Sequence, residues 1–151
     1  MVERQQDPAN PPQIYLASAS PRRQQLFQLL EIPHRVQVCD VDERAITAKT
    51  PREYALKTAF AKACALDDKV AQGSVVVSAD TIVVLDGETL LKPEDEDDAF
   101  RILSKIAGRV HHVISAIAVR EVGKATALDS VTTEVKIRAA TPEEIREYIK
   151  T

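Results

Sequence analysis

The chain has 151 residues, of which 44% are hydrophobic and 28% charged, and its formal net charge at pH 7 is -3. This length suits one domain with a sizeable core, and the acidic balance argues against a nucleic-acid scaffold, which usually carries a basic excess on one face. The most apolar stretch, Val75 to Leu85, is too short for a membrane span and contains Asp80.

Residues 1–12 hold three prolines among polar neighbours, and we expect them to form a disordered leader. They contain no apolar signal-peptide core, and Cys39 and Cys64 form no close-spaced motif, which favours a reducing compartment. The sequence therefore predicts a cytoplasmic protein with no membrane or nucleic-acid partner.

The segment Leu-Ala-Ser-Ala-Ser-Pro-Arg-Arg at 16–23 joins an expected strand to an expected helix. Ser20 is a suitable N-cap, and Pro21 at the first helical position loses no hydrogen bond. Arg22 and Arg23 are unfavourable beside the positive helix N-terminus unless an anion lies between them and the backbone. The alternative is a solvated pair of surface arginines, but the whole combination favours a phosphate site.

A short strand is expected at 35–38, and the polar stretch 40–49 that follows it is interpreted as an active-site loop. The run Thr-Pro-Arg-Glu at 50–53 predicts a capping box at the start of a second helix. Its apolar positions continue to about Ala71, and Gly73 is expected to end it.

The valine-rich run from Ser74 to Leu85 predicts a strand at the centre of a sheet, and Asp86-Gly87 predicts a hairpin that returns through 88–91. Asp80 lies inside this run. Because a buried carboxylate is costly without a partner, Asp80 marks a functional position, with a strand-end residue satisfied by a backbone turn as the alternative.

The acidic run 94–98 is expected to open a helix that ends before Gly108, since these charges complement the helix dipole. Strands at 110–119 and 127–138 follow, and then a helix that starts at Thr141. Strands interspersed with helices, plus one hairpin, predict an α/β fold with a mixed sheet. With four glycines the chain has no glycine-rich phosphate loop.

Lys62 and Lys92 are weaker signals, because most lysines are only solvated. Lys62 is expected on the second helix, facing the helix start at Arg22, and Lys92 ends the hairpin near Asp80. Together with the two arginines, these lysines would form a pocket able to hold a triphosphate.

Five blocks, at 16–23, 61–63, 78–83, 91–93 and 108–113, resemble in their order the Maf family of nucleoside triphosphate pyrophosphatases. The resemblance implies a mixed twisted sheet flanked by helices, with a central nucleotide cleft, as in inosine triphosphate pyrophosphatases. It also implies hydrolysis of the α-β phosphoanhydride with a divalent cation, Mg2+ or Mn2+. Members of the family are regarded as house-cleaning enzymes and were first linked to inhibition of septum formation.

By this resemblance, Asp80 is the catalytic carboxylate, which activates water directly or through the metal. Glu43 and Asp80 are the implied metal ligands. The implied phosphate-binding residues are Ser18, Arg22, Arg23, Lys62 and Lys92.

Arg22 and Thr81 resemble the family branch that acts on dTTP and UTP, whereas the branch acting on methylated guanine nucleotides tends to have Trp and Gln there. His111 and His112 point to opposite faces of a strand, so they are not expected to share a metal. The family normally continues beyond Thr151, so the resemblance implies that 13–151 is a single domain without the family's C-terminal segment. Association into a homodimer is a further expectation.

Two other functions stay open: a nucleotide-binding regulatory or vestigial protein linked to cell division, and a pyrophosphatase for damaged purine nucleotides. Release of pyrophosphate and dTMP from dTTP excludes the first. Comparing dTTP and UTP with inosine triphosphate and methylated GTP separates the second.

Overall fold

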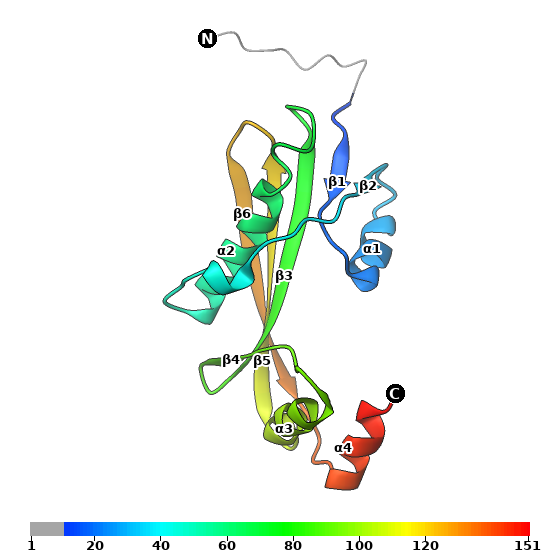
Figure 1. Cartoon of the computed structure of the whole chain (residues 1–151), viewed down its shortest axis with the longest axis vertical. Helices are drawn as coiled ribbons and strands as arrows, with labels where there is room; N and C mark the ends of the chain where they lie inside the picture. Colours follow the sequence, from blue (N-terminus) through cyan, green and yellow to red (C-terminus); the bar gives the residue numbers. More distant parts are fainter. Residues whose placement is uncertain (1–10) are drawn as a thin grey trace.

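The computed structural model describes residues 11–151, which form one six-stranded mixed sheet flanked by helices (Figure 1). The strands are β1 (Ile14–Leu16), β2 (Arg35–Val36), β3 (Val75–Leu85), β4 (Glu88–Leu90), β5 (Val110–Glu121) and β6 (Thr126–Lys136). The helices are α1 (Pro21–Gln28), α2 (Pro51–Cys64), α3 (Glu96–Ile106) and α4 (Pro142–Ile149), with a short 3-10 helix η1 (Glu43–Ala45). Of the expected leader, residues 1–10 lie outside the described residues. The predicted α/β fold with a mixed sheet is confirmed.

The sheet has the order β2-β1-β3-β5-β6, and β4 also pairs with β3. β3, which the sequence predicted to be a central strand, therefore lies at the centre of the sheet. The strands β3, β5 and β6 form a long antiparallel ribbon that runs between two lobes (Figure 1). The N-terminal lobe holds β1, β2, α1 and α2, and the C-terminal lobe holds β4, α3 and α4.

Helix α2 covers one face of β3 and β5. Its residues Ala55, Ala59 and Ala63 are fully buried, because small side chains on one helix face allow a close approach to the sheet. The buried Ser78 hydroxyl donates a hydrogen bond of 2.6 Å to the carbonyl of Ala59. This bond fixes α2 above the middle of the central strand.

One edge of β3 is shared by two strands. β1 pairs in parallel with Val75–Val77, and β4 pairs antiparallel with Val83–Leu85. On this edge, residues 78–82 have no neighbouring strand in the described part of the chain, whereas β5 pairs along the other edge from Val75 to Val84. A gap therefore separates the chain that leaves β1 from the chain that leaves β4.

The second helix is shorter than expected: α2 ends at Cys64 and not near Ala71. A series of turns follows, in which Leu66 is fully buried. Asp67 is held by Arg120 of β5 through two hydrogen bonds, of 2.8 and 2.7 Å. These contacts to the core and to a distant strand outweigh the local helical pattern.

The start of α2 departs from the expected capping box in one bond. Thr50 accepts a hydrogen bond from the Glu53 amide as expected, at 3.1 Å. The Glu53 carboxylate, however, accepts from the amide of Lys49 at 2.8 Å rather than from Thr50.

Within residues 11–151, no helix combines the length and apolar character needed to cross a membrane.

Candidate functional site

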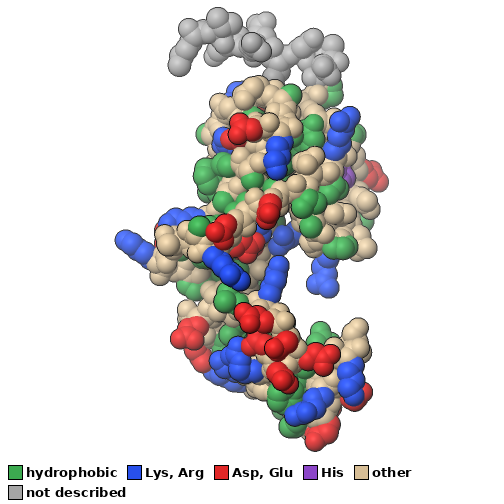
Figure 2. All heavy atoms as spheres, in the orientation of Figure 1, with side chains coloured by type: hydrophobic (Ala, Val, Ile, Leu, Met, Phe, Trp, Pro, Cys, Tyr) green, Lys and Arg blue, Asp and Glu red, His purple; other side chains and the backbone are tan. Residues whose placement is uncertain are grey.

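The gap in the edge of β3 gathers most of the residues that the sequence singled out. Ser18, Arg22 and Arg23 follow β1 on one side, and Lys92 follows β4 on the other. Asp80 and Thr81 lie on β3 between them. Figure 2 shows a hollow between the two lobes at this level, with Lys and Arg side chains on the rim formed by the N-terminal lobe.

The first turn of α1 is capped as expected. Ser20 accepts a hydrogen bond from the Arg23 amide at 3.4 Å. The Arg23 guanidinium reaches back to β3, where it donates to the Ala79 carbonyl at 3.0 Å and to the Thr81 hydroxyl at 3.2 Å. Since Ala79 and Thr81 flank Asp80, Arg23 ties α1 to the part of the strand that carries this carboxylate.

The remaining cations of the gap are not engaged. Arg22 and Lys92 are exposed, and neither makes a hydrogen bond or an ion pair with another described residue. Ser18 is buried, and its hydroxyl accepts a hydrogen bond from the Ser20 amide at 3.2 Å. Two free cations thus flank an open stretch of strand beside a helix N-terminus, an arrangement that suits an anionic ligand.

Lys62 lies between two carboxylates. Its Nζ is 3.1 Å from Asp80 Oδ1 and 2.9 Å from Glu43 Oε1. Burial disfavours the ammonium, but hydrogen bonds and charge from Glu43 and Asp80 outweigh it, so the pKa of Lys62 lies above its ordinary value. The sequence predicted that Lys62 faces the phosphate site near Arg22, and the contact with both carboxylates was not foreseen.

Asp80 keeps one oxygen without a partner. The residue is 6% exposed, and its Oδ2 is buried with no hydrogen-bond partner among the described residues. A buried carboxylate oxygen without a partner is costly, and a bound ion, an ordered water or a catalytic role can account for such an atom.

The carboxylates of Asp80 and Glu43 provide the oxygen ligands that hard divalent cations prefer. No group of three or more His, Cys, Asp or Glu side chains in residues 11–151 is placed to hold a metal. Mg2+ is often bound through one or two carboxylates together with substrate phosphates. The donor set therefore fits a metal that is completed by phosphate oxygens better than one enclosed by the protein.

Two residues at the site were missed by the sequence reasoning. The Tyr54 hydroxyl of α2 donates to the main-chain carbonyl of Glu43 at 3.2 Å and so holds η1 against the helix. Ser115 of β5 lies opposite Thr81, with the two hydroxyl oxygens 3.4 Å apart. Ser115 could have been singled out in the sequence, because it is a hydroxyl residue within the apolar run of β5. Nothing in the helical pattern of α2 distinguished Tyr54.

The two adjacent histidines lie on opposite faces of β5, as expected. His111 is buried with its Nδ1 unpaired among the described residues, whereas His112 is exposed and its Nε2 is 3.9 Å from Glu134. They are not arranged to share a metal ion.

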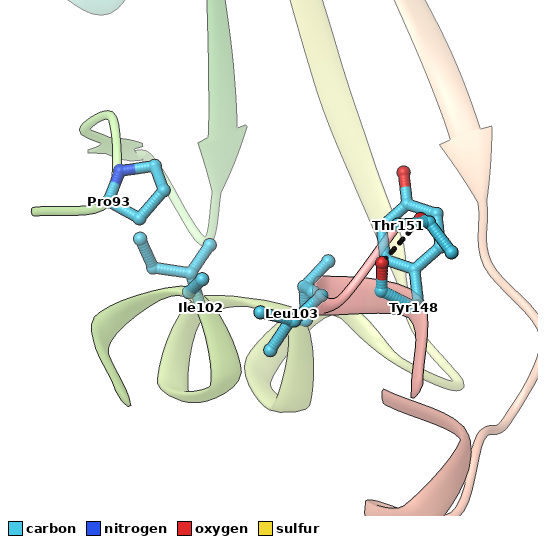
Figure 3. Close-up of a pocket in the computed structure, with 7 residues that line it drawn as sticks. Pro93, Ile102, Leu103, Tyr148 and Thr151 are labelled. Atoms are coloured by element: carbon cyan, nitrogen blue, oxygen red, sulfur yellow. Dashed lines mark hydrogen bonds between the residues drawn. The ribbon is translucent and has the colours of Figure 1, made fainter. Parts of the chain in front are cut away.

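An apolar pocket of about 390 Å3 lies between α3 and α4, in the C-terminal lobe (Figure 3). Its lining includes Pro93, Ile102, Leu103, Tyr148 and Thr151. No charged side chain among the described residues lines this pocket, so it is not arranged for phosphate chemistry.

Comparisons with known proteins agree with these features. The family described as Maf-like protein matches residues 13–151. The dTTP/UTP pyrophosphatase of Syntrophomonas wolfei is 42% identical over 135 residues, which cover 89% of this chain and 71% of that protein. The protein of the same name from Akkermansia muciniphila is 41% identical over 139 residues, or 92% of this chain and 72% of that protein.

Solved structures with the same fold are more distant in sequence. The Ham1 protein of Staphylococcus aureus superposes with a TM-score of 0.58 at 17% identity, over 82% of this chain and 71% of that one. The HAM1 protein of Coxiella burnetii gives a TM-score of 0.54 at 19% identity, over 83% and 72%. At these identities the likeness concerns the fold alone.

Proposed function

Because the chain belongs to the family of Maf-like proteins, we propose that it hydrolyses the α-β phosphoanhydride of nucleoside triphosphates and releases a monophosphate and pyrophosphate. The observation that carries the proposal is the buried Asp80, with one unpaired oxygen, beside a gap flanked by free cations. Its position at the middle of β3 brings a carboxylate next to the place where a triphosphate would lie.

Asp80 is the proposed catalytic residue. Its Oδ2 has no partner among the described residues and can accept a proton from water or orient the water for attack. Mg2+ or Mn2+ held by Glu43, Asp80 and the phosphates would neutralise phosphate charge and lower the pKa of bound water. In the free protein, Lys62 pairs with both carboxylates and so limits their repulsion of an arriving anionic substrate.

The phosphate-binding roles are divided among the residues of the gap. Arg22 and Lys92 would bind the triphosphate from the two lobes, because both cations are exposed and unengaged within residues 11–151. Lys62 and Ser18 lie deeper and would contact phosphates close to Asp80. Arg23 contributes charge, while its hydrogen bonds hold β3 in place.

The proposed substrates are dTTP and UTP. The relatives named as dTTP/UTP pyrophosphatases support this choice, as do Arg22 and Thr81, which follow the pattern of that branch. Thr81 lies on the floor of the gap, where its hydroxyl accepts from Arg23 and contacts Ser115, so it is placed to affect how a base lies.

The direct test is to incubate the protein with dTTP, UTP, CTP, inosine triphosphate and methylated GTP, each with Mg2+ or Mn2+, and to measure monophosphate and pyrophosphate. We expect dTTP and UTP to be turned over fastest. Binding of dTTP without any turnover would support the regulatory alternative, and preference for the purine nucleotides would overturn the substrate assignment.

Two further expectations are part of this proposal. The free thiols Cys39 and Cys64 support a reducing compartment, the cytoplasm. Association into a homodimer is the second, and light scattering of the purified protein tests it.

A further inference from the structure

The Lys62 ammonium holds the position between Glu43 and Asp80 that a divalent cation would share. We propose that Lys62 is a built-in substitute for the metal: in the free protein it pairs with both carboxylates and offsets one of their two negative charges, and it moves to the phosphates when the nucleotide binds. Metal and nucleotide then bind together, and free metal binds poorly. This inference rests on the proposed function, since it assumes that a triphosphate enters the gap.

The first support is the geometry of the three charged groups. One Nζ contacts a carboxylate oxygen from β3 at 3.1 Å and another from η1 at 2.9 Å. The Lys62 side chain is 17% exposed and that of Asp80 is 9% exposed, so solvent screens this pair little. The Glu43 side chain is 43% exposed, but its carboxylate meets that of Asp80 at the same ammonium, and two carboxylates brought this close repel each other unless a cation lies between them. Lys62 is the cation that the structure places there.

The second support is the unpaired oxygen of Asp80. Lys62 uses Oδ1, and Oδ2 stays buried without a partner in residues 11–151. An ammonium therefore satisfies the charge of Asp80 but only part of its hydrogen-bonding capacity. A divalent cation would compete with Lys62 for the negative charge of Asp80. The Oδ2 atom of Asp80 is still available to bind such a cation.

The third support is the difference between the contacts of Lys62 and those of Arg23. Arg23 is held by two hydrogen bonds from its guanidinium to β3. Lys62 is bound only through its ammonium, a point charge on a flexible four-carbon stem, and an ammonium can pair with a phosphate as well as with a carboxylate. An arriving triphosphate thus offers Lys62 a new partner.

The consequence is a coupling of the two ligands. A metal ion that binds the free protein must displace an ammonium from both carboxylates and leave it without a partner. When the triphosphate is present, Lys62 has a partner and the carboxylates become available. By linkage, nucleotide must then tighten metal binding by the same factor as metal tightens nucleotide binding.

Binding of Mn2+ to the nucleotide-free protein, followed through the electron paramagnetic resonance signal of free Mn2+, tests the proposal. Lys62→Met removes the charge and keeps an unbranched side chain, so we expect its Mn2+ affinity to rise at least about tenfold above wild type. Lys124→Met is the matched control, because Lys124 also pairs with a carboxylate, that of Glu121 at 2.8 Å, in the turn between β5 and β6. It should bind Mn2+ as the wild type does.

The double variant Lys62→Met with Asp80→Asn identifies where the metal binds, and the gain in affinity should disappear in it. A gain that persists in the double variant, or no gain in Lys62→Met, overturns the proposal. Wild-type protein gives an independent measurement that needs no variant. Its Mn2+ affinity should rise at least about tenfold with a non-hydrolysable α,β-methylene analogue of dTTP, and equal affinity with and without the analogue also overturns the proposal.

These outcomes are separate from those of the hydrolysis assay. If the wild-type protein hydrolyses dTTP but Lys62→Met does not bind Mn2+ more tightly than wild type, the proposed function stands. Only the proposed exchange of Lys62 for the metal is then rejected. If no triphosphate is hydrolysed and the gain is still found, the proposed function fails while Lys62 remains the group that excludes the metal.

Discussion

The Arg23 guanidinium donates a hydrogen bond of 3.0 Å to the main-chain carbonyl of Ala79, the residue that precedes Asp80. The bond joins residues 56 positions apart and occupies the strand edge that β1 and β4 leave open. Arg22, next along the chain, makes no such contact within residues 11–151 and is exposed. The two adjacent arginines therefore have different roles. Arg23 ties α1 to β3, and Arg22 is available to bind a ligand.

We expect Arg22→Ala to weaken dTTP binding by about 1.5–3 kcal/mol, the usual contribution of a charge-assisted hydrogen bond. The melting temperature should stay unchanged, because Arg22 supports no other described residue. Lys92→Ala should behave in the same way. The Michaelis constant and thermal unfolding measure the two effects, and an unchanged Michaelis constant for both variants would contradict the phosphate pocket. Arg23→Ala is the contrasting control and should lower the melting temperature as well.

Asp80→Asn should reduce turnover of dTTP by about 10²–10⁴-fold, the range for loss of a general base. The amide has nearly the same volume, so the fold and nucleotide binding should persist. Monophosphate release and calorimetric binding of dTTP measure the two quantities. Turnover within a few-fold of wild type would remove Asp80 from the mechanism.

The branch assignment predicts that Arg22→Trp combined with Thr81→Gln shifts preference away from dTTP. Gln at position 81 also replaces the hydroxyl that accepts from Arg23, so Thr81→Val, which removes only that hydroxyl, is the control. The ratio of kcat/KM for dTTP to that for methylated GTP is the measurement. If the ranking of substrates stays the same, these two positions do not select the base.

Tyr54→Phe should lower the free energy of unfolding by about 0.5–1.5 kcal/mol, because it removes the hydrogen bond to the Glu43 carbonyl. It should also lower kcat more than it raises the Michaelis constant, since η1 would hold Glu43 less firmly. Tyr15→Phe is the matched control, because the Tyr15 hydroxyl makes no hydrogen bond in the described chain. Equal effects of the two substitutions on kcat would show that Tyr54 does not position Glu43.

The ion pair between Asp67 and Arg120 predicts a dependence of stability on pH. Hydrogen bonds from Arg120 hold the pKa of Asp67 below its ordinary value. A lowered folded-state pKa stabilises the protein above the unfolded-state pKa of about 4, and that contribution is lost as the pH falls through the folded-state pKa.

Asp67→Asn should therefore be less stable than wild type at pH 7, and the difference should shrink at pH values below the folded-state pKa. Urea unfolding at a series of pH values measures this. Asp68→Asn, a change at an exposed neighbouring carboxylate, is the control. A difference between Asp67→Asn and wild type that is the same at all pH values would exclude the ion pair as its cause.

The sequence correctly predicted those parts of the fold that depend on residues close together in the chain. The continuous valine run placed β3 at the centre of the sheet, and the serine cap and proline placed the start of α1 at Pro21. The end of α2 was predicted wrongly, because it depends on the burial of Leu66 and on a contact between Asp67 and Arg120, which are 53 positions apart.

The contacts of Lys62 with Glu43 and Asp80 could not be predicted from the sequence either. Its two partners come from separate elements, η1 and β3, and which of them it meets depends on how the loop folds over α2. Charge type and helical position predict a cation near the site, but they do not distinguish a phosphate partner from a carboxylate partner. That choice is made by tertiary packing.

The three-stranded ribbon of β3, β5 and β6 is the connection between the two lobes in residues 11–151 (Figure 1). A ribbon that flexes moves least at its middle and most at its ends. Asp80 lies near the middle of β3, whereas Arg22 and Lys92 are carried by the separate lobes. A bend of the ribbon that brought the lobes together would therefore move Arg22 and Lys92 further than Asp80.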